Sequence, residues 1–292
     1  MRLFKIPIFF LFIFTSSYCQ TSHSDEDVEI CNNKFEFAAS EKLSKKPVGE
    51  VIVEIGKTFL GLDYEAHTLE KGDHEKLIVH LTGLDCYTFF ESSLVFARCI
   101  KKGKTTFEDF KEELKNIRYR NGEIYKYPSR LHYASDWMYD NAKRGIVTDV
   151  TEQIGGIPYV KKIQFMSTHP ESYKRLKNNP EYVSEIAEIE NKITDRKKYY
   201  IPQSKIEKHE SKIENGDIIL ITTGIKGLDI SHTGIAVKGA DGRIYFMHAP
   251  LKGKKIQITE EPLSDYINSI ERHTGIMVAR PADIQFNNET TQ

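Results

Sequence analysis

The stretch from Asp217 to His248 reads DIILITTGIKGLDISHTGIAVKGADGRIYFMH, and it decides the fold class. It holds three apolar runs separated by glycine-rich connections, at 217–223, 232–237 and 243–248. Runs of this length that are rich in Ile, Val and Phe predict β-strands, and Gly239-Ala-Asp-Gly242 predicts a hairpin turn. A fourth strand is expected over 275–280, where Pro281 ends the apolar run. We therefore expect an antiparallel sheet in the C-terminal third of the chain.

The chain upstream of this stretch predicts helices. Apolar side chains recur at helical spacing in four segments, 51–60, 107–114, 133–141 and 180–198. A fifth helix is expected to begin at Cys86, with Asp85 as its N-cap, and 77–81 reads as a short strand. Helices followed by antiparallel strands indicate an α+β fold, and no shift in composition marks a second domain. We expect a single domain over 35–285 with helical insertions.

Composition narrows the class of protein. The chain has 292 residues, with 41 Lys and Arg against 42 Asp and Glu, so its formal charge is −1. Apolar residues make up 39% and charged residues 28%, which is typical of a globular protein and excludes collagen-like, low-complexity and polytopic membrane chains. A charge near zero disfavours a nucleic-acid binder that depends on bulk phosphate neutralisation. No nucleic-acid partner is therefore expected.

The N-terminus has the layout of a secretory signal peptide. A positively charged start precedes the apolar run 6–14, and small and polar residues follow. The run is far shorter than the ~20 residues that span a bilayer as a helix. We expect cleavage after Cys19 and export to the periplasm or the exterior; lipid anchoring through Cys19 is the alternative. The segment 20–34 is polar and is expected to be flexible, and 286–292 to form a C-terminal tail.

Removal of residues 1–19 leaves three cysteines, Cys31, Cys86 and Cys99. An odd number in an exported protein indicates at least one free thiol. Pairing of Cys31 with Cys99 and two buried free thiols are both open from the sequence.

Cys86, His232 and His248 form the constellation with the clearest chemistry. Cys86 is expected at a helix N-terminus, where the helix dipole and free N–H groups favour a thiolate and could hold an oxyanion. A thiolate nucleophile needs a base, and His232 opens a predicted strand. His248 lies roughly opposite on the paired strand and could fix the tautomer of His232. A bell-shaped pH profile is expected for such a pair.

Plainer interpretations of the same residues stand beside this one. A cysteine at a helix start is often a packing residue, and a histidine that opens a strand is often structural. Together with Asp85 the three residues could also bind zinc. No short ligand pair such as CxxC or HxxxH occurs, so we expect neither a metal nor a cofactor.

Four motifs resemble those of the NlpC-type, papain-like cell-wall cysteine peptidases. They are Leu84-Asp-Cys-Tyr-Thr-Phe89, Asn215-Gly-Asp-Ile-Ile-Leu220, Ser231-His-Thr-Gly-Ile235 and Phe246-Met-His-Ala249. The resemblance implies a papain-like α+β fold whose nucleophile begins a helix packed on an antiparallel sheet. Tyr87 departs from the small Ser or Thr usual in the superfamily, which puts the shape of the cleft beside the nucleophile in doubt.

Further segments resemble one branch, the N-acetylmuramoyl-L-alanine amidase-like family. They are 129–137, Asp140-Asn141, Gly145, Asp149, 165–170, 200–202 and 227–232. The resemblance covers about residues 50 to 282. It implies hydrolysis of the amide bond between N-acetylmuramic acid and L-alanine in peptidoglycan fragments. It also implies Cys86 as nucleophile, His232 as base and then acid, and His248 as orienter, with an acyl-enzyme intermediate. No protein partner is evident.

Seven residues are candidates for binding the substrate: Tyr87, Arg130, Tyr133, Asp136, Trp137, Asp229 and Ser231. Arg130 could pair with a carboxylate of the stem peptide, and Tyr133 and Trp137 could stack on sugar or peptide faces. The structural alternatives are that Trp137 belongs to the core and that Asp136 caps a helix.

Other functions are compatible with the same motifs. An endopeptidase that cuts between D-glutamate and the diamino acid would use the same triad. A peptidoglycan-binding protein without activity would not need Cys86, and an acyltransferase would pass the acyl group to an amine instead of water.

Overall fold

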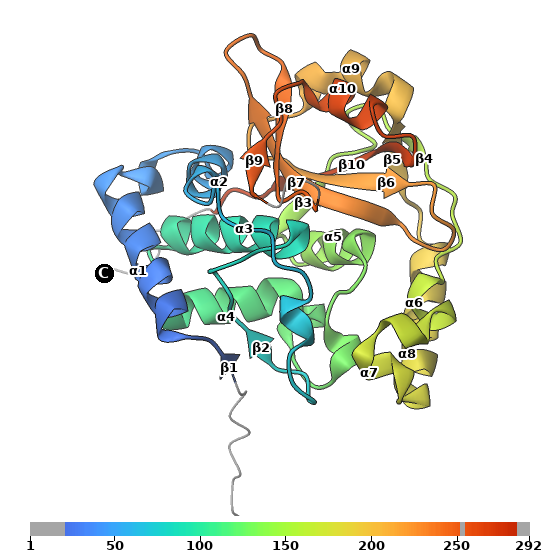
Figure 1. Ribbon diagram of the computed structural model, residues 1–292. Helices are drawn as coiled ribbons and strands as arrows, with labels where there is room; N and C mark the ends of the chain where they lie inside the picture. Colours follow the sequence, from blue (N-terminus) through green and yellow to red (C-terminus); the bar gives the residue numbers. More distant parts are fainter. Residues whose placement is uncertain (1–20, 252–254, 285–292) are drawn as a thin grey trace, which may run out of the picture.

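The computed structural model describes residues 21–251 and 255–284, so the predicted signal peptide and the tail 286–292 lie outside the described residues. Helices form one layer, and an antiparallel sheet lies across it (Figure 1). The α+β class expected from the sequence is therefore confirmed. None of the described helices is long and apolar enough to cross a bilayer.

The sheet has eight strands in the order β4-β5-β10-β6-β7-β8-β9, and β3 pairs with β10. The strands are β3 (Val147–Asp149), β4 (Ile157–Pro158), β5 (Tyr199–Pro202), β6 (Ile218–Thr223), β7 (Ile230–Lys238), β8 (Ile244–His248), β9 (Gln257–Ile258) and β10 (His273–Pro281). The predicted run of β6, β7 and β8 is confirmed. The last strand, β10, does not continue that run, because it inserts between β5 and β6.

The layer that packs against the sheet consists of helices from the first half of the chain (Figure 1). They are α1 (Asp25–Ser40), α2 (Val48–Lys57), α3 (Cys86–Lys102), α4 (Phe107–Arg118) and α5 (Ala134–Lys143). Helix α3 runs through the middle and packs against α2, α4 and β7. Its buried face carries Glu91, which accepts a 2.8 Å hydrogen bond from Arg118 Nε. This pair fixes α3 against α4 inside the core.

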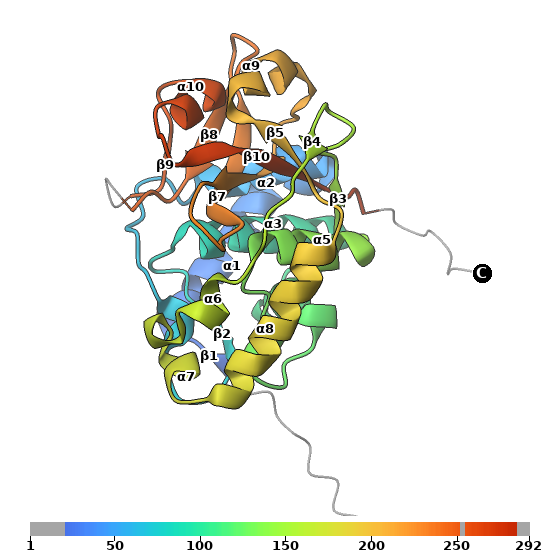
Figure 2. The ribbon, with the colours of Figure 1, turned by 90° about the vertical axis from the view of Figure 1, so that its right-hand side faces the viewer.

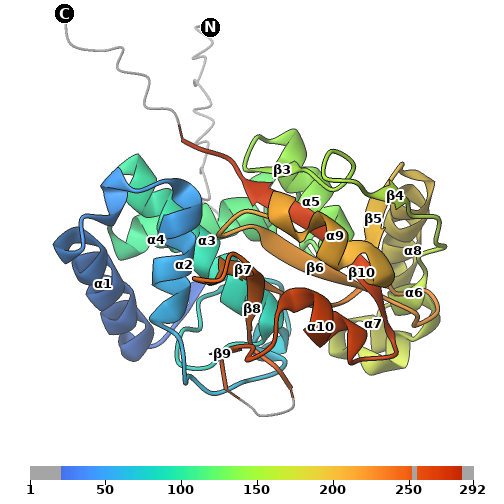
Figure 3. The ribbon, with the colours of Figure 1, turned by 90° about the horizontal axis from the view of Figure 1, so that it is seen from above.

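Both faces of the sheet are buried. Alternate side chains of a strand point to opposite faces. Accordingly Ile218 and Leu220 of β6 join the core with the helical layer, while Ile219 and Ile221 join a second cluster. The short helices α9 (Ile206–His209) and α10 (Leu263–Asn268) cover that second cluster (Figure 3). The sheet is thereby held rigidly between two layers.

An insertion between β4 and β5 forms a third, smaller cluster. It contains α6 (Phe165–Thr168), α7 (Lys174–Lys177) and the long α8 (Pro180–Asp195), which lies along one side of the molecule (Figure 2). Ile186 and Ile193 of α8 pack there with Tyr127 and Tyr133 from the helical layer. The helix expected over 180–198 is thus confirmed, with its end three residues earlier.

The structure corrects the expectation that 20–34 is flexible. Thr21 and Ser22 form β1, which pairs with β2 (Leu77–Ile78), and α1 follows immediately. Ser24 and Asp27 build a reciprocal cap, since Ser24 Oγ accepts from Asp27 N at 3.1 Å and Asp27 Oδ2 accepts from Ser24 N at 2.8 Å. The spacing of Ser24 and Asp27 is visible in the sequence and is typical of a helix start, although the segment as a whole is polar.

The three cysteines of the described residues are free thiols. Cys31 and Cys99 are buried in the core between α1, α3 and α4. Burial raises the pKa of the Cys31 thiol to about 12, and that of Cys99 rises as well, so both remain neutral. Only Cys86, which is half-buried, lies at a cavity.

Candidate active site

Cys86 is the first residue of α3, as expected. The Asp85 carboxylate caps the helix and accepts hydrogen bonds from the N–H groups of Tyr87 at 3.0 Å and Thr88 at 2.8 Å. The Thr88 hydroxyl in turn accepts from Asp85 N at 3.0 Å. Such a cap fixes the first turn of the helix. The cysteine therefore has a rigid backbone.

Strand β7 is tied directly to this helix start. The hydroxyl of Thr233 donates to the carbonyl oxygen of Cys86 at 2.8 Å. This bond holds β7 at the start of α3. His232 is the neighbouring residue on the strand, and it lines the same cleft as Cys86.

The two histidines meet across β7 and β8. His232 Nε2 and His248 Nδ1 are 2.7 Å apart, and His248 is buried. The register pairs Ile235 with Met247, so the histidines, expected roughly opposite one another, are diagonal neighbours on one face. At Gly234 a Cβ atom would lie 2.6 Å from the Phe246 ring. Glycine there allows Phe246 and His248 to close on His232.

These three side chains line one cleft of about 580 Å³, which we call the Cys86 cleft. Its wall also contains Tyr64, Ser231, Tyr266, Arg272 and His273. The structure thus brings the predicted nucleophile, base and orienter together, although Cys86 and His248 are 162 residues apart in the chain.

Both reacting groups are neutral at rest. Burial, and secondly the Asp85 carboxylate, raise the pKa of the Cys86 thiol to about 12, although hydrogen bonds from Thr233 oppose this. Burial lowers the pKa of His232 well below its usual value, and that of His248 to about 3. The sequence suggested a thiolate, whereas burial together with the Asp85 carboxylate favours the neutral thiol in the folded chain. The thiol must therefore lose its proton during the reaction.

The tautomers follow from this requirement. His232 can accept a proton on Nδ1 only if Nε2 carries hydrogen and donates it to His248 Nδ1. The hydrogen of His248 must then be on Nε2. That atom is buried and has no hydrogen-bond partner among the described residues. The pair consequently leaves a donor directed away from His232.

Comparison with known proteins decides the family. The model of the AmiA-like family, described as N-acetylmuramoyl-L-alanine amidase-like, matches residues 54–276. The chain belongs to this family. Membership supports a peptidoglycan amidase-like role and a hydrolase, with a substrate derived from peptidoglycan. No functionally curated protein matches the chain in sequence.

Solved structures agree with this placement. An N-acetylmuramoyl-L-alanine amidase from Bacteroides uniformis ATCC 8492 is 35% identical over 80% of this chain and 98% of its own, with a TM-score of 0.76. A xylanase candidate from Bacteroides fragilis is 39% identical over 77% of this chain and 98% of its own, with a TM-score of 0.73. A protein from Legionella pneumophila str. Philadelphia 1, 23% identical over 88% of this chain and 95% of its own, shares the fold with a TM-score of 0.67.

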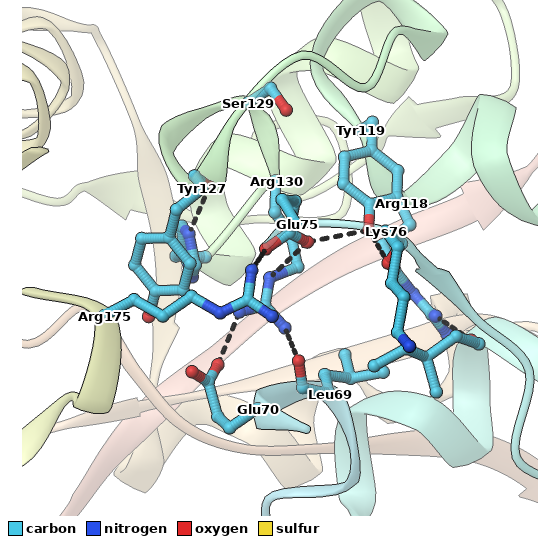
Figure 4. A network of polar contacts seen from close by, with 12 residues as sticks. Leu69, Glu70, Glu75, Lys76, Arg118, Tyr119, Tyr127, Ser129, Arg130 and Arg175 are labelled. Carbon is cyan, nitrogen blue, oxygen red and sulfur yellow. Dashed lines mark hydrogen bonds and ion pairs between the residues drawn. The ribbon is translucent and has the colours of Figure 1, made fainter. Parts of the chain in front are cut away.

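Arg130, expected at the substrate, is committed to an internal network in this amidase-like chain (Figure 4). Its guanidinium pairs with Glu70 and, at 3.5 Å, with Glu75. Glu75 also accepts from Arg175 at 2.6 Å and from the Tyr119 hydroxyl at 2.8 Å. We call these five residues the Arg130 network. It joins the loop before β2 to α7 and leaves the arginine 5% exposed.

Tyr133 and Asp136 have internal partners as well. The Tyr133 hydroxyl donates to Glu190 at 2.6 Å. The Asp136 carboxylate pairs with Arg120 at 2.6 Å and with Arg196 at 2.5 Å. Neither residue lines the Cys86 cleft, so a ligand there could contact them only if these bonds broke.

Trp137 and Asp229 are also buried away from the cleft. Trp137 meets the ring of Phe90 edge-on with centroids 4.9 Å apart, which agrees with the core alternative. Asp229 accepts from the backbone N–H of Ser135 at 2.9 Å and joins β7 to the start of α5. A contribution of Trp137 or Asp229 to substrate binding stays a prediction, because neither residue lines the Cys86 cleft.

Tyr87 and Ser231 lie closer to the nucleophile. Ser231 lines the Cys86 cleft, and its hydroxyl has no partner among the described residues. Tyr87 turns the other way, donates to the Leu131 carbonyl at 3.0 Å and lines a separate hollow of about 160 Å³ with Asp85 and Arg130. Of the seven substrate candidates, Ser231 alone lines the Cys86 cleft.

Several cleft residues were not singled out from the sequence, and four of them carry polar side chains of interest here: Tyr64, Tyr266, Arg272 and His273. Burial raises the pKa of both Tyr64 and Tyr266 to about 12, so the two phenols remain neutral donors. The four come from a loop, from α10 and from the start of β10. No short motif carries them, and only the tertiary fold identifies them.

Within the described residues, no group of three or more His, Cys, Asp or Glu side chains is arranged to hold a metal ion. The chemistry derived below uses the side chains alone.

Proposed function

We propose that the protein is an exported cysteine amidase of papain-like, NlpC-type fold. It hydrolyses the amide bond between N-acetylmuramic acid and L-alanine in peptidoglycan fragments. The observation that carries the proposal is the meeting of Cys86, His232 and His248 in one cleft. The signal-like residues 1–19, with Cys19 at the cleavage point, support export to the compartment that contains the substrate.

Acylation begins with the neutral pair. As Cys86 Sγ attacks the lactyl carbonyl carbon, its proton passes to Nδ1 of His232. The positive charge that forms on His232 is stabilised by the hydrogen bond to His248. The oxyanion can accept hydrogen bonds from the Cys86 backbone N–H at the start of α3 and from the phenol of Tyr64 at the cleft wall.

The tetrahedral intermediate collapses with cleavage of the C–N bond. His232 returns its proton to the leaving nitrogen, so the stem peptide departs with a free L-alanine amine. The muramoyl group stays on sulfur as a thioester. Water then attacks the thioester, His232 removes its proton, and Cys86 recovers that proton when the lactyl carboxylate is released.

The residues of the cleft do not support glycoside hydrolysis. That reaction uses a pair of carboxyl groups on opposite sides of the scissile bond. No Asp or Glu lines the cleft within the described part of the chain. The likeness to the xylanase candidate therefore extends to the fold without the acid and base of a glycosidase.

Product analysis tests the proposal. Purified disaccharide-tetrapeptide is digested with the wild type and with Cys86→Ala, and the products are separated by mass spectrometry. We expect intact tetrapeptide and peptide-free disaccharide from the wild type, and neither from Cys86→Ala. Cys99→Ala is the matched control, because it removes a buried core thiol outside the cleft.

The alternatives give different products. A disaccharide that carries L-Ala–D-Glu would indicate the endopeptidase and contradict the amidase. Absence of turnover in the wild type, together with unchanged binding by Cys86→Ala, would favour a peptidoglycan-binding protein. Transfer of the muramoyl group to an added amine in preference to water would favour an acyltransferase.

A further inference from the structure

We propose that Arg272 forms a carboxylate-binding subsite of the Cys86 cleft and that it holds the α-carboxylate of the D-glutamate in the stem peptide. The inference rests on the proposed function and deepens it, because it names the group that selects the substrate. It replaces Arg130, which the sequence suggested for this role and which the structure buries in a network.

Among the described residues, Arg272 gives the wall of the Cys86 cleft a positive charge. Arg272 is exposed, lines the cleft and has no ion-pair partner among the described residues. The other described lining residues include no Lys, Asp or Glu, so Arg272 supplies the formal charge of the wall. The hollow beside Tyr87 differs, since its wall contains Glu70 and Asp85 together with Arg118 and Arg130. The cleft is therefore complementary to an anion, whereas the smaller hollow is already balanced.

The same wall also contains buried polar atoms without a hydrogen-bond partner among the described residues. Nε2 of His248 and Nδ1 of His273 are both buried, and neither has a hydrogen-bond partner among the described residues. Both rings line the cleft. Buried polar groups in native proteins are normally satisfied. The His248 donor, whose hydrogen follows from the tautomer argument above, needs an acceptor, and a ligand in the cleft can provide one.

The chemistry of the substrate identifies the anion. The lactyl carboxyl group of muramic acid is consumed in the scissile amide, and L-alanine carries no charge. The next residue, D-glutamate, continues the chain through its γ-carboxyl group, so its α-carboxylate is free. Two residues of extended chain span ~7 Å, and this carboxylate is therefore the negative charge nearest the scissile bond.

Arg272 also acts on the base. After burial and the neighbouring histidines, its positive charge contributes to the lowered pKa of His232. A carboxylate bound to Arg272 would offset that charge and raise the pKa of His232. The correct substrate would then strengthen the base that attacks it.

Two substrates test the proposal, one with D-glutamate and one with D-isoglutamine, in which the α-carboxylate is an amide. For the wild type we expect KM to be about tenfold lower on the free acid, as for a charge-assisted hydrogen bond. Arg272→Gln should raise KM about tenfold on the acid and leave it unchanged on the amide. Arg272→Lys should give an intermediate value, because it retains the charge without the planar fork.

Lys226→Gln is the matched control for loss of one positive charge. Lys226 is exposed and lies at a separate hollow beside Phe165 and His169. We expect it to lower the rate on neither substrate. An equal loss in both Arg272→Gln and Lys226→Gln would mean general electrostatic attraction and would overturn the proposed subsite.

Binding separates this inference from the proposed function. Calorimetry with Cys86→Ala compares the acid and the amide without turnover. Preference for the acid that disappears in Cys86→Ala/Arg272→Gln supports the subsite, even if the products show another scissile bond. Equal affinity for the acid and the amide, or an equal loss on both, overturns the subsite and leaves the amidase activity as a separate result.

Discussion

The Cys86 cleft and the Arg130 network both contain charged side chains, but among the described residues only those of the network are paired with each other. In the network, Glu75 accepts from Arg175 and Tyr119 and pairs with Arg130, so its charges are balanced internally. In the cleft, Arg272 has no ion-pair partner among the described residues. Buried atoms without a hydrogen-bond partner in that part of the chain occur in both regions, at His248 and His273 in the cleft and at Glu70 and Arg130 in the network. The charge available to a ligand is therefore the one that no described carboxylate pairs with, even when other residues look more distinctive in the sequence.

The largest expected difference between the two regions is in turnover. His232→Ala removes the proton acceptor of the cleft and should lower kcat by about a thousandfold, while the free energy of unfolding changes little. The measurement is single-substrate kinetics on disaccharide-tetrapeptide, with urea unfolding of the same samples. His74→Ala, at an exposed position outside the cleft, serves as the control. A His232→Ala variant that retains more than a tenth of the wild-type kcat would contradict the role of base.

A substitution in the Arg130 network should have the opposite effect: it should lower stability and leave KM nearly unchanged. Arg130→Gln removes the cation paired with Glu70 and leaves Glu75 with Arg175 alone, and should lower the free energy of unfolding by about 2 kcal/mol. Because Arg130 does not line the Cys86 cleft, KM per folded molecule should stay within about twofold. Arg130→Lys is the conservative comparison. If stability were retained and KM rose strongly, Arg130 would be a substrate residue, as the sequence suggested.

The pH dependence shows a smaller effect. The active pair has a protonated thiol and an unprotonated His232. Acid removes this form only when pH falls through the lowered pKa of His232, and base removes it only near the Cys86 pKa of about 12. The plateau of kcat/KM should therefore extend across the neutral range and below the usual histidine value of about 6.5. A basic limb far below pH 12, where an imidazolium would lose its proton, would indicate the resting thiolate–imidazolium pair that the sequence alone suggested.

Local signals in the sequence were sufficient for the elements that hold Cys86, His232 and His248. The Asp85 cap and the preceding glycine predict the start of α3 at Cys86, and the turn at 239–242 predicts the β7–β8 hairpin. These local signals do not show that the start of α3 lies next to β7. The hydrogen bond from the Thr233 hydroxyl to the Cys86 carbonyl oxygen joins the two, and only the folded chain shows it.

The features that the sequence did not predict share one physical cause, because they depend on contacts between segments far apart in the chain. β10 inserts beside β5, which lies more than seventy residues earlier in the chain, and no local pattern encodes such long-range pairing. Burial likewise depends on the whole fold. Trp137 and Asp136 carry side chains suited to a binding site, but the fold places them in the interior. Arg272 lies in a polar turn that resembles any exposed loop until β10 carries it to the cleft.

The most direct test of the central claim is the mass of the acylated enzyme. The protein is mixed with disaccharide-tetrapeptide, quenched in acid during the first turnover, and analysed as intact protein and as peptides. The account predicts an adduct equal to the muramoyl disaccharide without its peptide, attached to Cys86 and absent from Cys86→Ala. An adduct that retains L-Ala–D-Glu, or one attached to any other residue, would contradict it.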